Sequence, residues 1–294
     1  MILLLGSILF STFLTVAFKL CDRFDINKFQ AILFNYLTCL LTGSVVNNSF
    51  PPYGSSISEP WFKWALVMGL GFVISFNLIA VTVQKSGLAI ASVASKLSLV
   101  IPFVAAVFLY NESVSILNII GIVLAIIAVV FTLYSPVRTP AENKGSSLMS
   151  GTFILPVVVF LLTGFLDSLV KYVEQNFLHG DNNDEYLVMA FTSAFAGSLL
   201  VFLYRVAKGG DWLQFRAVLA GVVIGIPNYF SIWCLMKVLK MYPGQSAVML
   251  PVNNMGIVLA SGLIAAFVFK EHLRKINWIG IILSIISICL IAFG

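Results

Sequence analysis

A lysine lies near the middle of a long apolar segment, where its charge has to be stabilised. The segment SGLAIASVASKLSLVIPFVAAVFLYNE runs from Ser86 to Glu112, and the lysine is Lys96. A charge at the centre of a membrane helix costs about 2.5–3.5 kcal/mol on insertion scales, so such residues face water, a partner or a substrate. Snorkelling to an interface is the alternative, but Lys96 lies nine residues from position 87 and fourteen from position 110, the ends of the predicted helix. We therefore predict that Lys96 lines a binding site.

Hydroxyl and backbone groups surround this lysine in the sequence. Ser92 lies one turn before Lys96, and Ser95 and Ser98 flank it. Because Pro102 has no N–H group, we expect the carbonyl of Ser98 to lack its helical partner. The lysine, the serines and a free carbonyl together predict a polar site at the midplane of a membrane.

Asp167 is the only carboxylate deep inside an apolar segment. Lys171 follows at the i to i+4 spacing, so a local ion pair is one reading. The other reading is functional, with Asp167 as a proton-coupling carboxylate or as the counter-charge of Lys96. The sequence leaves both readings open.

Two adjacent amides, Asn253 and Asn254, lie in the apolar run LPVNNMGIVLAS. Adjacent helical side chains point about 100 degrees apart, so one amide can face a cavity while the other contacts a neighbouring helix. We assign Asn254 to the cavity ahead of Asn253, because Asn254 is the repeat mate of Ser95 in the internal repeat described below. Met255 is the mate of Lys96.

Further polar and aromatic residues occur in two other apolar segments. Such side chains either join helices or line a cavity for polar and flat ligand groups. Prolines interrupt the predicted helices at 216–240 and 244–269, at Pro227 and Pro251. Interrupted helices in corresponding positions point to a transporter's site. These additional candidates are Asn77, Asn228, Tyr229 and Trp233.

Several kinds of chemistry find no motif in this chain. H-E-x-x-H, G-x-S-x-G and phosphate-loop patterns are absent. The two histidines, His179 and His272, have no acid or nucleophile at a spacing typical of a catalytic motif. The four cysteines form no C-x-x-C pair, which argues against a metal site or a disulfide framework. We predict neither an enzyme nor a bound metal or cofactor.

The composition defines the environment of these residues. Of 294 residues, 60% are hydrophobic and 10% charged, with a mean hydropathy of +1.02, so we predict an all-α integral membrane protein. The net charge of +5 resides mostly in short loops, which indicates membrane orientation rather than nucleic-acid binding. Ten transmembrane helices are predicted, at 2–20, 28–46, 61–84, 87–110, 115–134, 149–174, 185–206, 216–240, 244–269 and 275–293.

An internal repeat divides the chain. ESVSILNIIG at 112–121 matches EHLRKINWIG at 271–280 with a shift of 159 residues. We predict a first five-helix repeat at 1–135, a linker at 136–147 and a second five-helix repeat at 148–294. Five helices per repeat invert the second copy in the membrane. The residues that we interpret as structural are Glu112, Asn118, Gly121, Glu271, Asn277 and Gly280, with Pro102 and Pro251.

These features resemble the drug/metabolite transporter (DMT) superfamily, of the EamA type. The likeness rests on the five-plus-five arrangement, the helix-ending glutamate before a glycine-bearing last helix, and the run SKLSLVIPF. The resemblance implies two inverted repeats around a central cavity lined by helices one, three, four, six, eight and nine. It places the segments around Phe13, Asn77, Lys96, Asp167, Asn228 and Asn253 on the pathway.

The function expected is that of a secondary transporter that moves a small organic solute, such as an amino acid or a drug-like compound, by alternating access. A cationic cavity would suit a carboxylate. An assembly protein without a solute, and a uniporter or channel without ion coupling, are the alternatives. Expected partners are the solute, the lipid bilayer and no nucleic acid; proton coupling and a homodimer both fit the chain. The charge bias predicts a bacterial inner-membrane protein with both termini outside.

Overall fold

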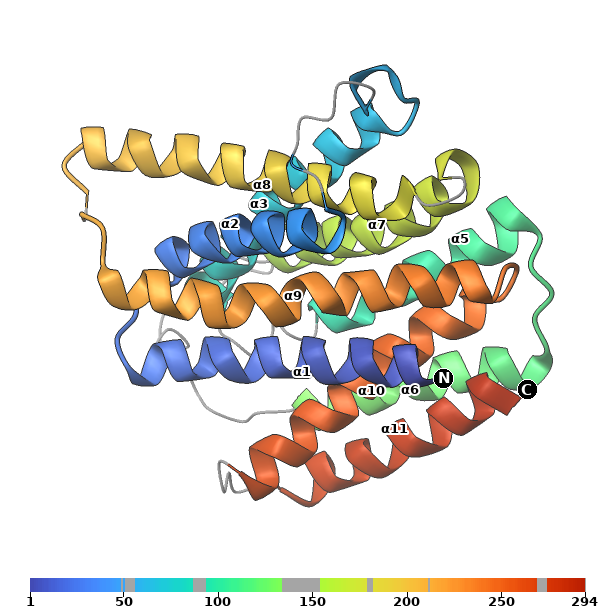
Figure 1. Cartoon of the computed structure of the whole chain (residues 1–294). Helices are drawn as coiled ribbons and strands as arrows, with labels where there is room; N and C mark the ends of the chain where they lie inside the picture. Colours follow the sequence, from blue (N-terminus) through green and yellow to red (C-terminus); the bar gives the residue numbers. More distant parts are fainter. Residues whose placement is uncertain are drawn as a thin grey trace. The chain divides into compact units, whose positions relative to one another are not determined.

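The computed structural model describes residues 1–48, 50, 56–86, 94–133, 154–178, 182–210, 212–268 and 274–293, and over these residues the chain is helical without strands (Figure 1). Each of the ten predicted segments contains an α-helix, which confirms the all-α prediction. Within the described residues, seven helices are long and apolar enough to cross a membrane, and shorter apolar helices occur at Ile2–Phe18, Ala94–Tyr110 and Ile116–Phe131. The elements are α1 (Ile2–Arg23), α2 (Lys28–Val46), η1 (Ser56–Ser58), α3 (Phe62–Ser86), α5 (Val100–Tyr110), α6 (Ile116–Leu133), α7 (Ile154–Phe177), α8 (Asn182–Ala207), α9 (Phe215–Met241), α10 (Ser246–Phe267) and α11 (Lys275–Phe293).

The predicted helix at 87–110 is interrupted beside its lysine. A helical turn at 94–97 ends in a turn at 98–99, and α5 begins at Val100. The carbonyl of Ser98 accepts a hydrogen bond from the backbone N–H of Ile101 at 2.9 Å. Our expectation of a free Ser98 carbonyl is therefore wrong, because a tighter i to i+3 bond replaces the one that Pro102 cannot make.

The chain forms two compact units. Unit 1 comprises residues 1–74 and 169–241, and unit 2 comprises residues 75–168 and 242–294. Helices α3 and α7 each contribute residues to both. The compact units therefore differ from the predicted five-helix repeats, because each compact unit takes helices from both halves of the chain.

In unit 1, α9 packs along α1 and α2, and α2 also packs on α8. Two glycines one turn apart on α9, Gly221 and Gly225, allow the contact with α2. A Cβ atom at Gly225 would lie 2.5 Å from Cβ of Thr38 and 2.8 Å from the carbonyl oxygen of Asn35. This is the small-residue spacing that lets membrane helices approach closely.

Hydrogen bonds join the α1–α2 connection to the α8–α9 connection in unit 1. The backbone N–H of Asn27 donates to Oε1 of Gln214 at 2.8 Å, and the backbone N–H of Gln214 donates to Oε1 of Gln30 at 2.7 Å. Nε2 of Gln30 also donates to the carbonyl of Trp212 at 2.9 Å. The two connections therefore lie at the same end of the unit.

In unit 2, α6 and α11 pack side by side and run antiparallel (Figure 1). Asn118, near the start of α6, contacts Ile291 near the end of α11, and Asn277, near the start of α11, contacts Phe131 near the end of α6. Gly121 allows this approach, since a Cβ atom there would lie 2.6 Å from Cγ1 of Ile291. Helix α10 packs against α5, α6 and α11.

Candidate functional site

Three sequence-predicted side chains come together in unit 2. Lys96 precedes α5, Asp167 lies on α7 and Asn254 lies on α10. Nδ2 of Asn254 donates to Oδ2 of Asp167 at 3.4 Å. Lys96 and Asp167 are near enough for their opposite charges to attract each other. We call Lys96, Asp167 and Asn254 the Lys96 cluster.

A glycine on α7 allows a close contact with α5 beside this cluster. Gly164 lies against Ile101, and a Cβ atom at Gly164 would lie 2.7 Å from Cβ of Ile101. Asp167 follows Gly164 by three residues and so lies on the same side of α7. The lack of a side chain at Gly164 therefore brings the Asp167 carboxylate toward the segment that carries Lys96.

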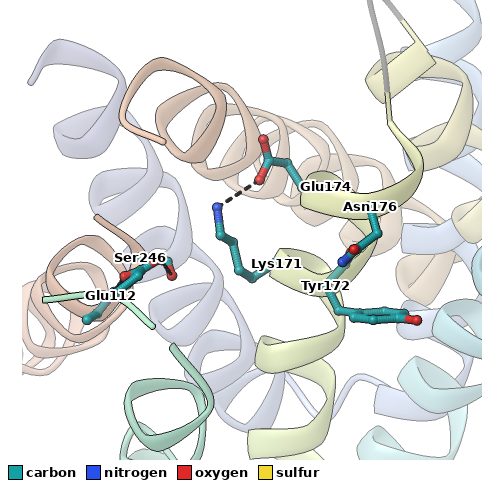
Figure 2. Close-up of polar contacts among 7 residues, drawn as sticks. Glu112, Lys171, Tyr172, Glu174, Asn176 and Ser246 are labelled. Carbon is teal, nitrogen blue, oxygen red and sulfur yellow. Dashed lines mark hydrogen bonds and ion pairs between the residues drawn. The ribbon is translucent and has the colours of Figure 1, made fainter. Parts of the chain in front are cut away.

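Lys171 is not the partner of Asp167 in this structure. Nζ of Lys171 pairs with Oε2 of Glu174 at 3.1 Å, one turn further along α7 (Figure 2). Both side chains are largely buried, with 5% and 12% exposed. The local pairing of Asp167 with Lys171 is therefore not formed, and the carboxylate of Asp167 instead accepts from Asn254 on α10. Sequence reasoning overlooked Glu174, although its i to i+3 spacing from Lys171 was visible.

The other candidates of unit 2 differ in their surroundings. Ser95 is half-buried, and its carbonyl accepts from the hydroxyl of Ser98 at 2.6 Å. Asn77, on α3, is also half-buried. Asn253 is 5% exposed, and its Oδ1 has no hydrogen-bond donor among the described residues. Ser92 lies outside the described residues.

Asn228, Tyr229 and Trp233 belong to unit 1. Nδ2 of Asn228 donates to Oδ1 of Asn35 on α2 at 3.1 Å, a bond between two helices. Sequence reasoning missed Asn35. Its Oδ1 lies 3.7 Å from the Sγ of Cys39, and this thiol donates to the carbonyl of Gly225 at 3.2 Å. The contact of Asn228 is that of a residue joining helices.

Aromatic packing surrounds the other two residues of this group. Tyr229 is fully buried and meets Phe191 and Phe230. Trp233 packs edge-on against Phe230, and the ammonium of Lys237 lies 5.3 Å from its ring centroid. Lys237 also pairs with Asp184 on α8 at 3.6 Å. The ion pair thus joins the first turn of α8 to the last part of α9, beside the indole of Trp233.

Glu112 contacts the start of α10. Its Oε1 accepts from the hydroxyl of Ser246 at 2.5 Å, and its Oε2 accepts from the backbone N–H of Ala247 at 2.7 Å. Figure 2 shows Glu112 and Ser246 directly against each other. A carboxylate that accepts from the first N–H groups of a helix acts as its N-terminal cap. Its repeat mate, Glu271, lies outside the described residues.

The structure describes no metal-binding group. Within the described ranges, no three His, Cys, Asp or Glu side chains are placed to hold a metal ion. The charged groups on the apolar helices instead contact one another and neighbouring amides.

Long apolar helices with charges and amides held between them define a multi-pass membrane protein. The model of the EamA-like transporter family matches residues 1–134 and 151–293, so the chain belongs to this family. An uncharacterized protein of Haemophilus influenzae (strain ATCC 51907 / DSM 11121 / KW20 / Rd) is 29% identical over 293 residues, which cover 97% of this chain and 95% of that protein. A solved crystal structure has a similar fold, with a TM-score of 0.75, 14% identity, and coverage of 98% of this chain and 94% of that one.

Proposed function

We propose that this protein is a secondary transporter for a small organic solute and that the Lys96 cluster binds the solute. The observation that carries the proposal is the meeting of Lys96, Asp167 and Asn254 from three separate segments of unit 2. Charged groups inside a membrane protein are tolerated where a partner, water or a substrate replaces their hydration. All three side chains are half-buried.

The pairing of charges narrows the class of solute. Lys96 alone would make a cationic site that suits a carboxylate, but Asp167 places an opposite charge in reach of it. A zwitterion fits this pair, with its carboxylate on the Lys96 ammonium and its ammonium on the Asp167 carboxylate. Asn254 supplies both a donor and an acceptor beside them. We therefore propose an amino acid or a related zwitterionic metabolite as the solute.

Alternating access of the two five-helix repeats is the mechanism that we propose. Membership of the EamA-like transporter family supports it, and so does the antiparallel pairing of α6 and α11, the last helix of each predicted repeat. Asp167 is the proposed proton carrier, because it is a carboxylate that accepts from the amide of Asn254 and lies within electrostatic range of Lys96. Protonation would release its attraction for Lys96 and couple solute binding to the proton gradient.

We also propose a bacterial inner-membrane location with both termini outside. The crowding of basic residues in the odd-numbered connections supports this orientation. The hydrogen bonds between the first and the seventh connections agree with their placement on one side of the membrane. A C-terminal fluorescent-protein fusion that glows in the bacterial cytoplasm would contradict the orientation.

The test compares Lys96→Met with the parent protein. Purified protein is screened by thermal shift against a library of amino acids and related metabolites, and hits are measured for uptake into proteoliposomes. Methionine keeps the volume of lysine without its charge, so Lys96→Met should fold normally and bind at least tenfold more weakly, which is about 1.4 kcal/mol. Lys275→Met, at an exposed position, is the matched control.

Three outcomes separate the alternatives. Parent-like uptake by Lys96→Met, at equal amounts in the membrane, removes Lys96 from the site. Saturable uptake that a proton gradient leaves unchanged indicates a uniporter or channel. The absence of stabilisation and uptake with every compound in the library favours an assembly protein whose polar residues only join helices.

A further inference from the structure

A lateral groove runs between α1 and α9 in unit 1. Its volume is about 500 Å³, and its walls include Phe13, Ala17 and Cys21 from α1 and Leu219 and Val223 from α9. Cys21 is 3% exposed, while Leu219 and Val223 are 52% and 57% exposed. The groove therefore has a packed floor and open, apolar rims.

The groove has a charge at one end only. Arg216, in the first turn of α9, lines it together with Phe24 and Ile26, which mark the end of α1 and the start of the first connection. Arg216 is exposed, and no carboxylate of the described residues pairs with it. The other lining residues are apolar. An apolar groove that ends at a single guanidinium is complementary to an amphiphile with an anionic head group.

The dimensions suit one acyl chain. Phe13 lies on α1 and Phe24 directly follows its last residue, and this separation of eleven residues is about 16 Å at 1.5 Å per residue. This length is about half of the roughly 30 Å hydrocarbon core, the share that one leaflet contributes. The rims face outward from α1 and α9, where lipid has access to a membrane protein.

More positive charge lies at the same end of unit 1. A second groove, of about 410 Å³, begins at Asn27, directly after Ile26, and includes Arg205 and Lys208 near the end of α8. The guanidinium of Arg205 lies 4.2 Å from the ring centroid of Phe29. Basic residues near a membrane surface attract anionic lipid. Arg205, Lys208 and Arg216 thus raise the local concentration of anionic lipid beside the first groove.

We propose that the groove between α1 and α9 holds one anionic phospholipid, with an acyl chain along α1 and the phosphate on Arg216. A planar guanidinium binds phosphate in bidentate geometry. The bound lipid covers the apolar rims and links α1 to α9 at their shared end. This inference is independent of the solute site, since its residues belong to unit 1 and the Lys96 cluster belongs to unit 2.

The test measures lipid preference without measuring transport. The thermal stability of the full-length protein in detergent is followed with added phosphatidylglycerol or phosphatidylcholine of matched chains. Phosphatidylglycerol should stabilise the protein at a concentration at least tenfold lower than phosphatidylcholine requires. Arg216→Gln should remove that preference, while Arg274→Gln, an exposed arginine of unit 2, should preserve it. Equal stabilisation by the two lipids, or an unchanged preference in Arg216→Gln, would overturn the proposal.

A second variant tests the chain rather than the head. Ala220→Leu adds bulk inside the groove and should weaken phosphatidylglycerol binding at least several-fold, as judged by the fraction of lipid-bound protein in native mass spectrometry. Inorganic phosphate is the probe for a site that needs no chain. Stabilisation by phosphate equal to that by phosphatidylglycerol would replace the lipid with a free anion. Concentration-dependent dimerisation that Ala220→Leu abolishes and lipid does not affect would assign the groove to a second copy of the chain.

Discussion

Asn118 and Asn277 each complete the helix that carries the other. Nδ2 of Asn118 donates to the carbonyl of Ile291 at 2.9 Å, and Nδ2 of Asn277 donates to the carbonyl of Phe131 at 3.0 Å. Both carbonyls lie among the last four of their helices, which have no partner within the helix. In a membrane no water replaces that partner. Each asparagine also accepts, through Oδ1, from a backbone N–H three residues before it, at 2.8 and 2.9 Å.

Asn118→Asp tests the bond between α6 and α11. Aspartate keeps the acceptor for the start of α6 but loses the donor to Ile291 and places a carboxylate against its carbonyl. A buried polar group without a partner costs about 1–3 kcal/mol, so the folded protein should lose about that much stability in thermal unfolding. Asn176→Asp is the matched control, because Asn176 donates to the carbonyl of Tyr172 at an exposed position. Equal effects of the two substitutions would contradict a special role for Asn118.

Gly121→Ala tests how tightly the same two helices pack. A Cβ atom at Gly121 would lie 2.6 Å from Cγ1 of Ile291 and 3.1 Å from its backbone nitrogen, so α6 and α11 would have to separate. The yield of folded protein should fall, with transport per folded molecule little changed. At Gly197 a Cβ atom would meet its nearest atom at 3.5 Å, so Gly197→Ala should be tolerated. A normal yield of Gly121→Ala with lost transport would assign Gly121 to function instead of packing.

The positions of the helices could be predicted because they depend on local composition. Helix α2 occupies 28–46 and α11 occupies 275–293, as hydropathy alone predicted. The interruption at 98–99 could be predicted only in part. Pro102 showed that a bond was missing, but the N–H of Ile101 that replaces it depends on how the backbone relaxes.

The partners of the candidate residues were harder to predict. Asp167 had Lys171 as a nearby candidate, but Glu174 also lies within one turn of Lys171, so spacing alone did not decide which carboxylate would pair with the lysine. The contact of Gly164 with Ile101 depends on which faces of α7 and α5 meet, a property of the whole fold. The close approach at Gly221 and Gly225 was not predicted, although their i to i+4 spacing is a pattern typical of close helix contacts in membranes.

Asp167→Asn separates a proton carrier from a fixed counter-charge. Asparagine keeps a polar group within reach of Asn254 but removes the titratable charge. If Asp167 carries the proton, the variant should lose uptake driven by a proton gradient at least tenfold and retain exchange of labelled for unlabelled solute. Proteoliposome assays with and without a gradient measure both activities. Loss of exchange and driven uptake together would make Asp167 a binding residue only.

Gly164→Ala tests whether the approach of α7 to α5 builds the solute site. The added methyl group would lie 2.7 Å from Cβ of Ile101, an atom close to the backbone that cannot simply rotate away. Helix α7 must then move outward and take Asp167 away from Lys96, although no charged residue has changed. Misplacing a binding group by about 1 Å is enough to lose much of its contribution. We therefore expect solute affinity, measured per folded molecule, to fall several-fold, in addition to any loss of folded yield relative to Gly197→Ala. Restoration of binding in Gly164→Ala combined with Ile101→Ala, which removes the opposing side chain, would show that the effect passes through this contact. A Gly164→Ala protein with parental affinity would mean that the Lys96 cluster does not depend on the contact between Gly164 and Ile101.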